Sequence, residues 1–330
     1  MSKNVILVDY QVPENWDYHR AIEKETGTSW DIVTCNTHRY QGSKLKVICR
    51  YLRYFFFSFR MFTKRNRYEK VIAWQQFYGL LIAFYCRFFH VKKCPDIYIM
   101  TFIFKPKKNN TYNKFIRYIV ASKYIKKLIV MSDSEKKYYS ELFGISEDKF
   151  YCTRIGVPDV TETIAPDPES EKYYLSVGRS NRDYKFLRDA WKAEYGKLVI
   201  ICDSYNEAEK EGIQCLDSCY GDDYLKMVAN CYAEIIPLDD VNISSGSLSF
   251  LQAMMLSKPT IVTENKTVHD YIESGHNGII IQKDSDELSD ALKMLDDKDN
   301  YDSICRNARK VYEDNFSEYS LGVSISEILK

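Results

Sequence analysis

The fold is decided by residues 237–264, Pro237-Leu-Asp-Asp-Val-Asn-Ile-Ser-Ser-Gly-Ser-Leu-Ser-Phe-Leu-Gln-Ala-Met-Met-Leu-Ser-Lys-Pro-Thr-Ile-Val-Thr-Glu264. The apolar run 233–238 predicts a strand that leads into this stretch. Leu248, Leu251 and Met255 then recur at helical spacing until Lys258-Pro259 ends the helix. The run 260–263 predicts the next strand, so the order strand, loop, helix, strand indicates an α/β domain.

The loop within this stretch, 242–247, consists mostly of small polar residues around one glycine. A loop of this kind at the start of a helix offers unpaired backbone N–H groups, hydroxyls and the positive end of the helix dipole. These features are typical of an anion site, above all for phosphate. The same residues are also typical of an ordinary serine-capped helix, because serine is favoured at N-caps for structural reasons.

Length and composition indicate a globular chain of two domains. The chain has 330 residues, of which 45% are apolar and 28% charged. The ten cysteines lack paired metal-ligand spacing, and the closest two, Cys215 and Cys219, have no histidine cluster nearby. The apolar run at the start is too short for a secretory signal, which predicts a reduced, cytosolic chain. The longest apolar stretch, 77–89, is too short to cross ~30 Å of hydrocarbon.

Charge is divided unequally between the two halves. Residues 1–157 carry 28 Lys and Arg against 13 Asp and Glu. The whole chain has 46 basic and 46 acidic residues, so residues 158–330 carry 18 basic against 33 acidic residues. Such asymmetry suggests that the first half faces an anionic partner, either nucleic acid or a membrane.

Apolar runs typical of strands alternate with helical patterns along the chain. The expected strands are 5–8, 31–35, 70–73, 96–104, 127–131, 173–177, 197–202, 233–238, 260–263 and 279–281. Helices are expected between and after them, including 113–125, 286–295 and 301–315. This alternation indicates βαβ units and mostly parallel sheets, whose binding sites lie beyond the carboxyl ends of the strands.

The segment 44–67 is unusual, because 32–68 contains no acidic residue. On a helix, five basic residues share one face: Lys46, Arg50, Arg53, Arg60 and Lys64. Five apolar residues share the other: Ile48, Leu52, Phe55, Phe59 and Phe62. This pattern is typical of a helix lying on an anionic bilayer, which the surplus of phenylalanine favours. The alternative is a domain helix whose apolar face packs on the sheet. Nucleic acid is less favoured, because no matching motif accompanies the basic residues.

The second half resembles the donor domain of family 4 glycosyltransferases, which have the two-domain GT-B fold. The resemblance is carried by Gly178-Arg179 after a strand, Lys185, the Ser/Gly loop ahead of Phe250-Leu-Gln-Ala-Met254, Lys258-Pro259, Asp270-Tyr-Ile-Glu-Ser-Gly-His-Asn-Gly278, Asn307-Ala-Arg309 and Asn315-Phe-Ser317. It is good over 173–317, looser over 123–158 and poor over the first hundred residues.

The resemblance implies an α/β chain of two Rossmann-like domains that face each other across a cleft. Residues 1–157 form the acceptor-side domain, 158–172 the linker and 173–313 the donor-binding domain. The final helix, 314–330, is placed to cross back to the first domain.

The resemblance also implies the site. Catalysis must stabilise charge that grows on the β-phosphate of the leaving nucleoside diphosphate, and Arg179 and Lys185 would form the cationic clamp. The clamp replaces a metal, so neither a metal nor another cofactor is expected; the alternative for Arg179 is a pairing with Asp183. The implied donor-binding residues are Gly178, Tyr220, Asp239, Ser244, Ser245, Gly246, Ser247 and Gln252. On the acceptor side we expect His19 and the basic face of 44–67.

Two departures from the family pattern stand out. Where the family has two glutamates, this chain has Ser244 and Gln252. Gln252 can still hydrogen-bond ribose hydroxyls. Ser244 does not supply the negative charge of the missing glutamate, and Asp239 is a candidate to supply it instead. The first domain also lacks the glycine-rich loop and the central histidine of the family. No catalytic base is assigned, and the family implies that the leaving phosphate can take the proton of the acceptor.

These observations predict a retaining glycosyltransferase that moves a sugar from a UDP- or GDP-linked donor to a hydroxyl. The basic segment 44–67 suggests a lipid-linked saccharide acceptor at the inner face of a cell membrane, as in bacterial surface-polysaccharide assembly. The alternatives are a nucleotide-sugar epimerase or hydrolase of the same fold, or a non-catalytic binding subunit, which the missing glutamates favour.

Overall fold

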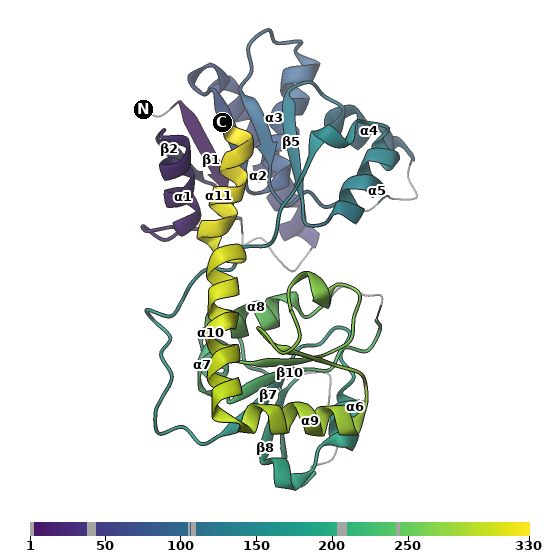
Figure 1. The fold of residues 1–330 in the computed structure, drawn as a ribbon. Helices are drawn as coiled ribbons and strands as arrows, with labels where there is room; N and C mark the ends of the chain where they lie inside the picture. The colour runs from purple at the N-terminus through teal and green to yellow at the C-terminus, as the bar shows by residue number, and fades with distance from the viewer. Residues whose placement is uncertain (1–2, 38–43, 105, 107–109, 203–209, 242–244) are drawn as a thin grey trace. The chain divides into compact units, whose positions relative to one another are not determined.

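Two parallel sheets organise the chain in the computed structural model of the protein (Figure 1). The structure describes residues 3–37, 44–104, 106, 110–202, 210–241 and 245–330. Two units separate: Met1–Ile155 together with Leu321–Lys330 form unit 1, and Gly156–Ser320 form unit 2. Each unit contains one sheet of six strands.

In unit 1 the parallel strands follow the order β2-β1-β3-β4-β5-β6. They are β1 (Asn4–Val8), β2 (Trp30–Thr34), β3 (Lys70–Ala73), β4 (Asp96–Ile99), β5 (Ile125–Val130) and β6 (Phe150–Cys152). The expected strand 96–104 is shorter in the structure, because Thr101 adopts a φ of 48°, which ends the extended conformation. The strand β6 had no counterpart in the prediction.

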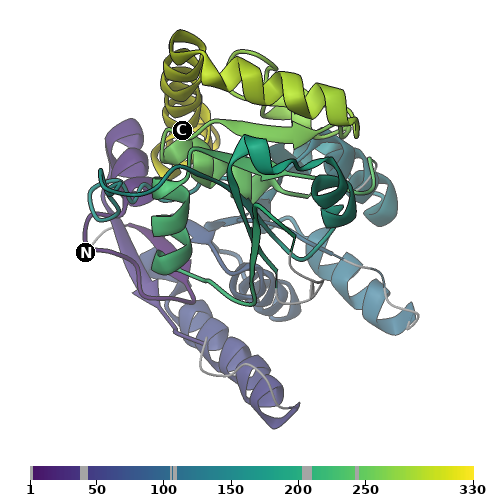
Figure 2. The ribbon, with the colours of Figure 1, turned by 90° about the horizontal axis from the view of Figure 1, so that it is seen from below.

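Helices cover both faces of this sheet (Figures 1 and 2). They are α1 (Asp17–Thr26), α2 (Lys44–Thr63), α3 (Gln76–Phe88), α4 (Asn110–Val120), α5 (Asp133–Phe143) and the residues of α11 (Glu318–Leu329) from Leu321 on. Because side chains alternate along a strand, Val5 and Leu7 of β1 pack with α2 and α3, whereas Ile6 and Val8 pack with α1 and α11.

The end of the chain is held tightly on unit 1. A Cβ atom on Gly322 would lie 2.7 Å from the carbonyl oxygen of Tyr18, so only glycine permits this approach of α11 to α1. The hydroxyl of Tyr151 donates a 2.9 Å hydrogen bond to the carbonyl of Ser324. Lys70 donates to the carbonyl of Leu329. These contacts place α11 against the strands of unit 1.

Unit 2 repeats the parallel arrangement with the order β12-β11-β10-β7-β8-β9. Its strands are β7 (Tyr173–Val177), β8 (Lys197–Ile201), β9 (Ile213–Leu216), β10 (Ala233–Ile236), β11 (Thr260–Thr263) and β12 (Ile279–Ile281). Its helices are α6 (Tyr184–Ala190), α7 (Asp222–Asn230), α8 (Ser247–Met255), α9 (Ser285–Asp296) and α10 (Lys298–Asn315). The edge strand β9 escaped prediction because it has four residues and exposes Gln214 and Cys215.

Both units therefore have the helix-covered parallel sheet of a Rossmann-like domain, which confirms the predicted α/β class. In unit 2 the chain order of the strands reverses between β7 and β10. In an open α/β sheet, the crevice outside the carboxyl ends at such a point is the usual ligand site.

Candidate functional site

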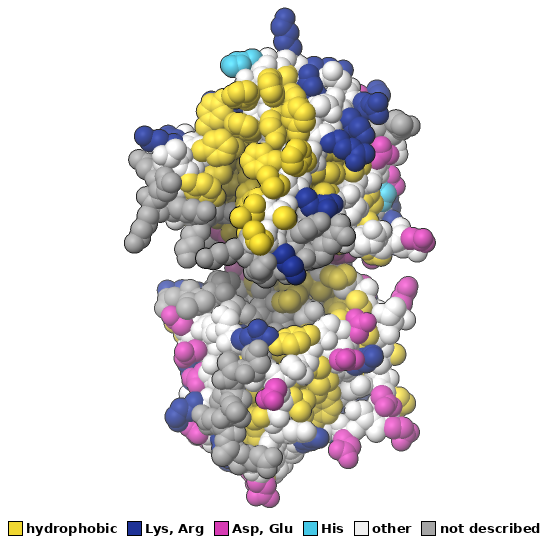
Figure 3. Space-filling model, turned by 180° about the vertical axis from the view of Figure 1, so that it is seen from behind, with side chains coloured by type: hydrophobic (Ala, Val, Ile, Leu, Met, Phe, Trp, Pro, Cys, Tyr) yellow, Lys and Arg dark blue, Asp and Glu magenta, His cyan; other side chains and the backbone are white. Residues whose placement is uncertain are grey.

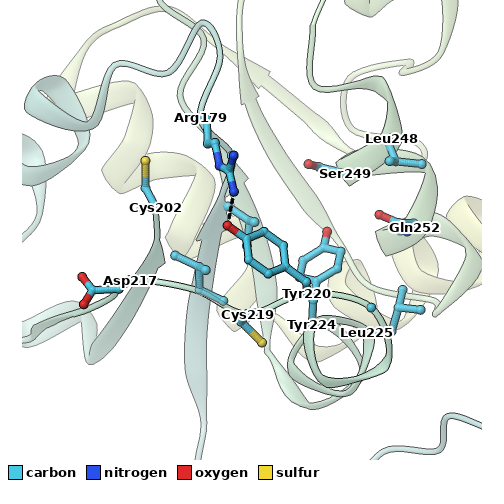
Figure 4. Close-up of a pocket in the computed structure, with 14 residues that line it drawn as sticks. Arg179, Cys202, Asp217, Cys219, Tyr220, Tyr224, Leu225, Leu248, Ser249 and Gln252 are labelled. Atoms are coloured by element: carbon cyan, nitrogen blue, oxygen red, sulfur yellow. Dashed lines mark hydrogen bonds between the residues drawn. The ribbon is translucent and has the colours of Figure 1, made fainter. Parts of the chain in front are cut away.

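The switch point of unit 2 opens into a cavity of about 310 Å³ (Figure 4). Residues from the ends of β7 and β8, the loop after β9, α7 and α8 line it: Val177, Gly178, Arg179, Ile201, Cys202, Asp217, Cys219, Tyr220, Gly221, Tyr224, Leu225, Leu248, Ser249 and Gln252. A concave, mainly apolar lining with a few polar side chains is typical of a small-molecule site. The cavity unites four predicted site residues, namely Gly178, Arg179, Tyr220 and Gln252.

Arg179 and Tyr220 form one wall of the cavity. A terminal nitrogen of the Arg179 guanidinium donates a hydrogen bond to the Tyr220 hydroxyl, and the guanidinium carbon lies 5.3 Å from the ring centroid (Figure 4). This contact joins the loop after β7 to the loop after β9 and places a permanent positive charge at the cavity.

Gly178 gives Arg179 its position. Its φ is 130°, and a Cβ atom there would lie 2.8 Å from the guanidinium of Arg182. Any other residue would therefore be strained and would push Arg182 away. The sequence pattern Gly178-Arg179 thus has a steric basis.

Lys185 is not at the cavity. It lies in the first turn of α6, its side chain is 80% exposed, and it pairs with Asp189 one turn later. Asp183, the expected alternative partner of Arg179, caps α6 by accepting from the Phe186 amide at 2.9 Å and pairs with Lys283 at 2.9 Å. The structure therefore brings only Arg179 of the expected clamp to the cavity.

The Ser/Gly loop is tied to the loop after β7 by Asn181. The side-chain nitrogen of Asn181 donates to the Ser245 hydroxyl at 3.1 Å, and the side-chain oxygen of Asn181 accepts from the backbone N–H of Asp240 at 2.6 Å. Gly246 precedes α8 with a φ of 83°, and Ser247 is the first helical residue. The backbone N–H groups at this helix start have the orientation that suits an anion. Ser244 lies outside the described residues.

Asp239 is also outside the cavity lining. Its carboxylate pairs with Lys283 at 3.1 Å, and the same lysine pairs with Asp183. Lys283 therefore neutralises part of the negative charge that Asp239 would offer to a ligand.

A cluster of ionisable residues beneath the loop after β7 was not predicted from the sequence. It consists of Arg182, Tyr224 and Glu234. Arg182 donates to the carbonyls of Val177 at 3.1 Å and Ser180 at 3.0 Å, which fixes the loop that carries Arg179. Burial lowers the pKa of Arg182 and raises the pKa of Tyr224, which lines the cavity.

Glu234 is fully buried on β10. Burial raises its pKa to about 8, while the positive charge of Arg182 acts in the opposite direction. The carboxyl group is therefore mainly protonated at neutral pH. The only available sequence signal was an acidic residue inside the otherwise apolar run 233–238.

The predicted acceptor-side residues lie in unit 1. The Nε2 atom of His19 lies 2.8 Å from the carbonyl oxygen of Trp30 and 3.4 Å from Glu23, so this histidine joins α1 to β2. Arg53 and Arg60 line a hollow of about 610 Å³ beside Cys35. Lys46 is exposed, and Arg50 and Lys64 are half-buried.

The helix α2 buries a different stripe from the predicted apolar face. It packs in unit 1 through Tyr54, Phe57, Met61 and Phe62. Of the predicted apolar face only Phe62 is buried, while Ile48, Leu52, Phe55 and Phe59 are exposed. The alternative, a domain helix whose apolar face packs on the sheet, is therefore wrong for four of the five residues of that face.

No group of three or more His, Cys, Asp or Glu residues is arranged to hold a metal ion within the ranges that the structure describes. No helix in that same part of the chain is both long enough and apolar enough to span a membrane.

No known family model and no curated protein matches the sequence. Solved structures of glycosyltransferases with the GT-B fold match over the whole chain. They include Anabaena Alr3699/HepE in complex with UDP (12% identity, TM-score 0.61, 99% of each chain). A glycosyltransferase from Rickettsia africae (15%, 0.63, 99% of each chain) is also similar. So is sucrose-phosphate synthase from Thermosynechococcus elongatus (12%, 0.62, 99% of this chain and 98% of that one). The predicted GT-B fold is confirmed.

Proposed function

We propose that the protein is a retaining glycosyltransferase that moves a sugar from a UDP- or GDP-linked donor to a hydroxyl acceptor. The observation that carries the proposal is the cavity at the switch point of unit 2, with Arg179 in its wall. The similar Anabaena protein has UDP bound, and it has also been solved with UDP-glucose.

The chemistry follows from the groups at the cavity. The apolar lining accommodates the nucleoside, with Gln252 available to ribose hydroxyls. Arg179 and the backbone amides of Gly246 and Ser247 attract the diphosphate. The bond from the anomeric carbon to the β-phosphate oxygen breaks, and the bond to the acceptor oxygen forms. The leaving phosphate takes the acceptor proton, and the positive charge of Arg179 stabilises the growing negative charge. The proposed reaction needs no metal cofactor, because these groups supply the charge.

The proposed acceptor is a lipid-linked saccharide at the inner face of a cell membrane, within surface-polysaccharide synthesis. Its support is the charge of residues 1–157, with 28 basic against 13 acidic residues. Anionic lipids attract such a surface over about one Debye length. Sedimentation with anionic liposomes that weakens at high salt is the expected result, whereas equal recovery in the supernatant with and without liposomes would contradict it.

Thermal unfolding with nucleotides tests the donor site. Purified protein is heated with UDP, GDP, CDP or ADP, each with and without Mg²⁺. We expect one nucleotide to raise the Tm by several degrees without Mg²⁺, since a ligand at about 100 times its Kd adds about 2.7 kcal/mol. The shift should vanish in Arg179→Ala and persist in Lys293→Ala, which removes an exposed lysine of α9. No shift with any nucleotide would favour a non-catalytic protein. Turnover of a nucleotide sugar without an acceptor would favour the epimerase or hydrolase.

A further inference from the structure

Unit 1 exposes large apolar side chains on three neighbouring helices. We define the aromatic surface as Phe55, Phe56 and Phe59 of α2, Phe88 and Phe89 at the end of α3, and Phe115 of α4. Phe56 is 72% exposed and Phe88 58% exposed. Leu45, Ile48 and Leu52 extend the surface along α2. Figure 3 shows hydrophobic side chains gathered on this unit in one broad strip.

Ring contacts through the buried Phe62 and the half-buried Phe84 join the three helices that carry the aromatic surface. Phe62 stacks on Phe89 with centroids 5.5 Å apart, which joins α2 to the end of α3. Phe84 lies 5.7 Å from Phe88 and 5.3 Å from Phe115, which joins α3 to α4. Isolated exposed apolar residues are normal on soluble proteins, but a contiguous strip marks an interaction site.

A hollow of about 590 Å³ borders the aromatic surface at the end of α3. Four basic residues line it, Arg87, His90, Lys92 and Lys123, together with Tyr118 and Tyr124. Arg87 donates to the carbonyl of Tyr118 and lies 3.9 Å from the centroid of that ring, so its guanidinium has a defined position. Arg87 contacts Tyr118, which follows Phe115 by three residues on α4. Residues three apart on a helix are neighbours, so the hollow borders the exposed rings.

Charge identifies the partner. Residues 32–132, which include all three helices, carry 21 Lys and Arg and only two acidic residues, Glu69 and Asp96. A second copy of the chain would present the same positive charge to itself in a symmetric contact, which is repulsive. An anionic bilayer satisfies both features, because its acyl region accepts phenylalanine and its headgroups accept cations.

We propose that the aromatic surface inserts into one leaflet of an anionic bilayer while the hollow of Arg87, His90, Lys92 and Lys123 binds a lipid headgroup phosphate. The inference builds on the proposed membrane setting and adds an apolar insertion and a headgroup site. Tyr51 and Tyr118, at the edge of the exposed strip, have the amphipathic rings that favour the headgroup level.

Vesicle flotation of the full chain tests the proposal. Vesicles of phosphatidylcholine alone are compared with vesicles containing phosphatidylglycerol, at low and high salt. The double variant Phe56→Ser with Phe88→Ser should reduce the vesicle-bound fraction at least tenfold at low salt. The double variant Lys92→Ala with Lys123→Ala should lose at least tenfold of the preference for phosphatidylglycerol vesicles, because it removes two cations of the headgroup site. Lys137→Ala, in which an exposed lysine of α5 is removed, should behave as the unaltered chain.

Two further measurements keep the outcomes separate. The Tm without ligand, unchanged in every variant, shows that the variants fold. The nucleotide-induced shift reads the donor site independently, so bilayer binding without a nucleotide shift would overturn the proposed function alone. If the double phenylalanine variant floats as well as the unaltered chain does, the proposed insertion of the aromatic surface is wrong. A dimer that the phenylalanine substitutions dissociate, without any flotation, would overturn the bilayer in favour of a second copy.

Discussion

The two units share an architecture but use different parts of it. Unit 2 has a cavity at the carboxyl ends of its strands, where Arg179 and Tyr220 join the loops after β7 and β9. Unit 1 reverses its strand order between β1 and β3, where Gln75 lies 3.5 Å from Asp9. Its most distinctive feature, however, is the outer face of its helices, with the aromatic surface and the basic hollow. The comparison teaches that a Rossmann-like sheet provides the support, while loops or helix faces provide the chemistry.

The largest expected effect is the loss of catalysis in Arg179→Ala. Removing one preorganised charge from a transition state typically costs about 10²–10³ in kcat, so we expect transfer to fall by at least about a hundredfold. Arg179 is exposed, so the Tm should stay unchanged. Steady-state kinetics provides the measurement, with the nucleotide sugar whose nucleotide raises the Tm. Near-normal turnover would contradict the assignment of chemistry to unit 2.

Lys185→Ala sharpens the same comparison. If Lys185 only forms the exposed pair with Asp189 outside the cavity, transfer should fall less than about tenfold, because exposed ion pairs contribute little. A loss as large as that of Arg179→Ala would show that α6 moves Lys185 to the donor during the reaction.

Gly322→Ala tests how unit 1 holds the end of the chain. The added Cβ would lie 2.7 Å from both the Tyr18 carbonyl oxygen and the Ala21 side chain. Overpacking of this kind typically costs about 1–3 kcal/mol. We expect a lower Tm and an unchanged nucleotide-induced shift. Ser320→Ala, near the start of α11, should lower the Tm less, because it loses only the 2.9 Å hydrogen bond from its hydroxyl to the Ser317 carbonyl. An unaltered Tm in Gly322→Ala would contradict the close packing of α11.

Glu234→Gln tests the pH dependence of stability in unit 2. Burial raises the folded pKa of Glu234 to about 8, above its unfolded value. The native state then binds a proton that the unfolded state has released, so this contribution to stability is present at low pH and is lost as pH rises through about 8. Between pH 5 and pH 8, unfolding of the unaltered chain should therefore release about one more proton than unfolding of the variant. Identical slopes of unfolding free energy against pH would contradict the raised pKa.

Much of the fold followed from local patterns. The apolar runs of β1, β3, β7, β8, β10, β11 and β12 predicted buried strands because parallel sheets bury both faces. The polar helix α5 was missed, although Ser132 caps it and Gly144 ends it in the left-handed conformation. The edge strands β6 and β9 were missed because they are short and half-exposed.

The candidate site was predictable where a motif is local. Gly178 and Arg179 are adjacent in the chain, and Gly246 directly precedes α8. The roles of these residues depend on local backbone sterics and on the helix dipole, so the sequence was enough to predict them. The partnership of Arg182 with Glu234 escaped prediction, because strands β7 and β10 are neighbours only in the folded sheet. The position of Lys185 outside the cavity likewise depends on the direction of α6.

The sequence alone determined the alternation of strands and helices and the charge of each half, since these depend on local periodicity and composition. Only the tertiary structure decided which stripe of α2 is buried. Tyr54, Phe57, Met61 and Phe62 pack inward, so the predicted apolar face is left largely exposed. A helix with phenylalanines around most of its circumference offers several apolar stripes, and the contacts with α3 select one of them.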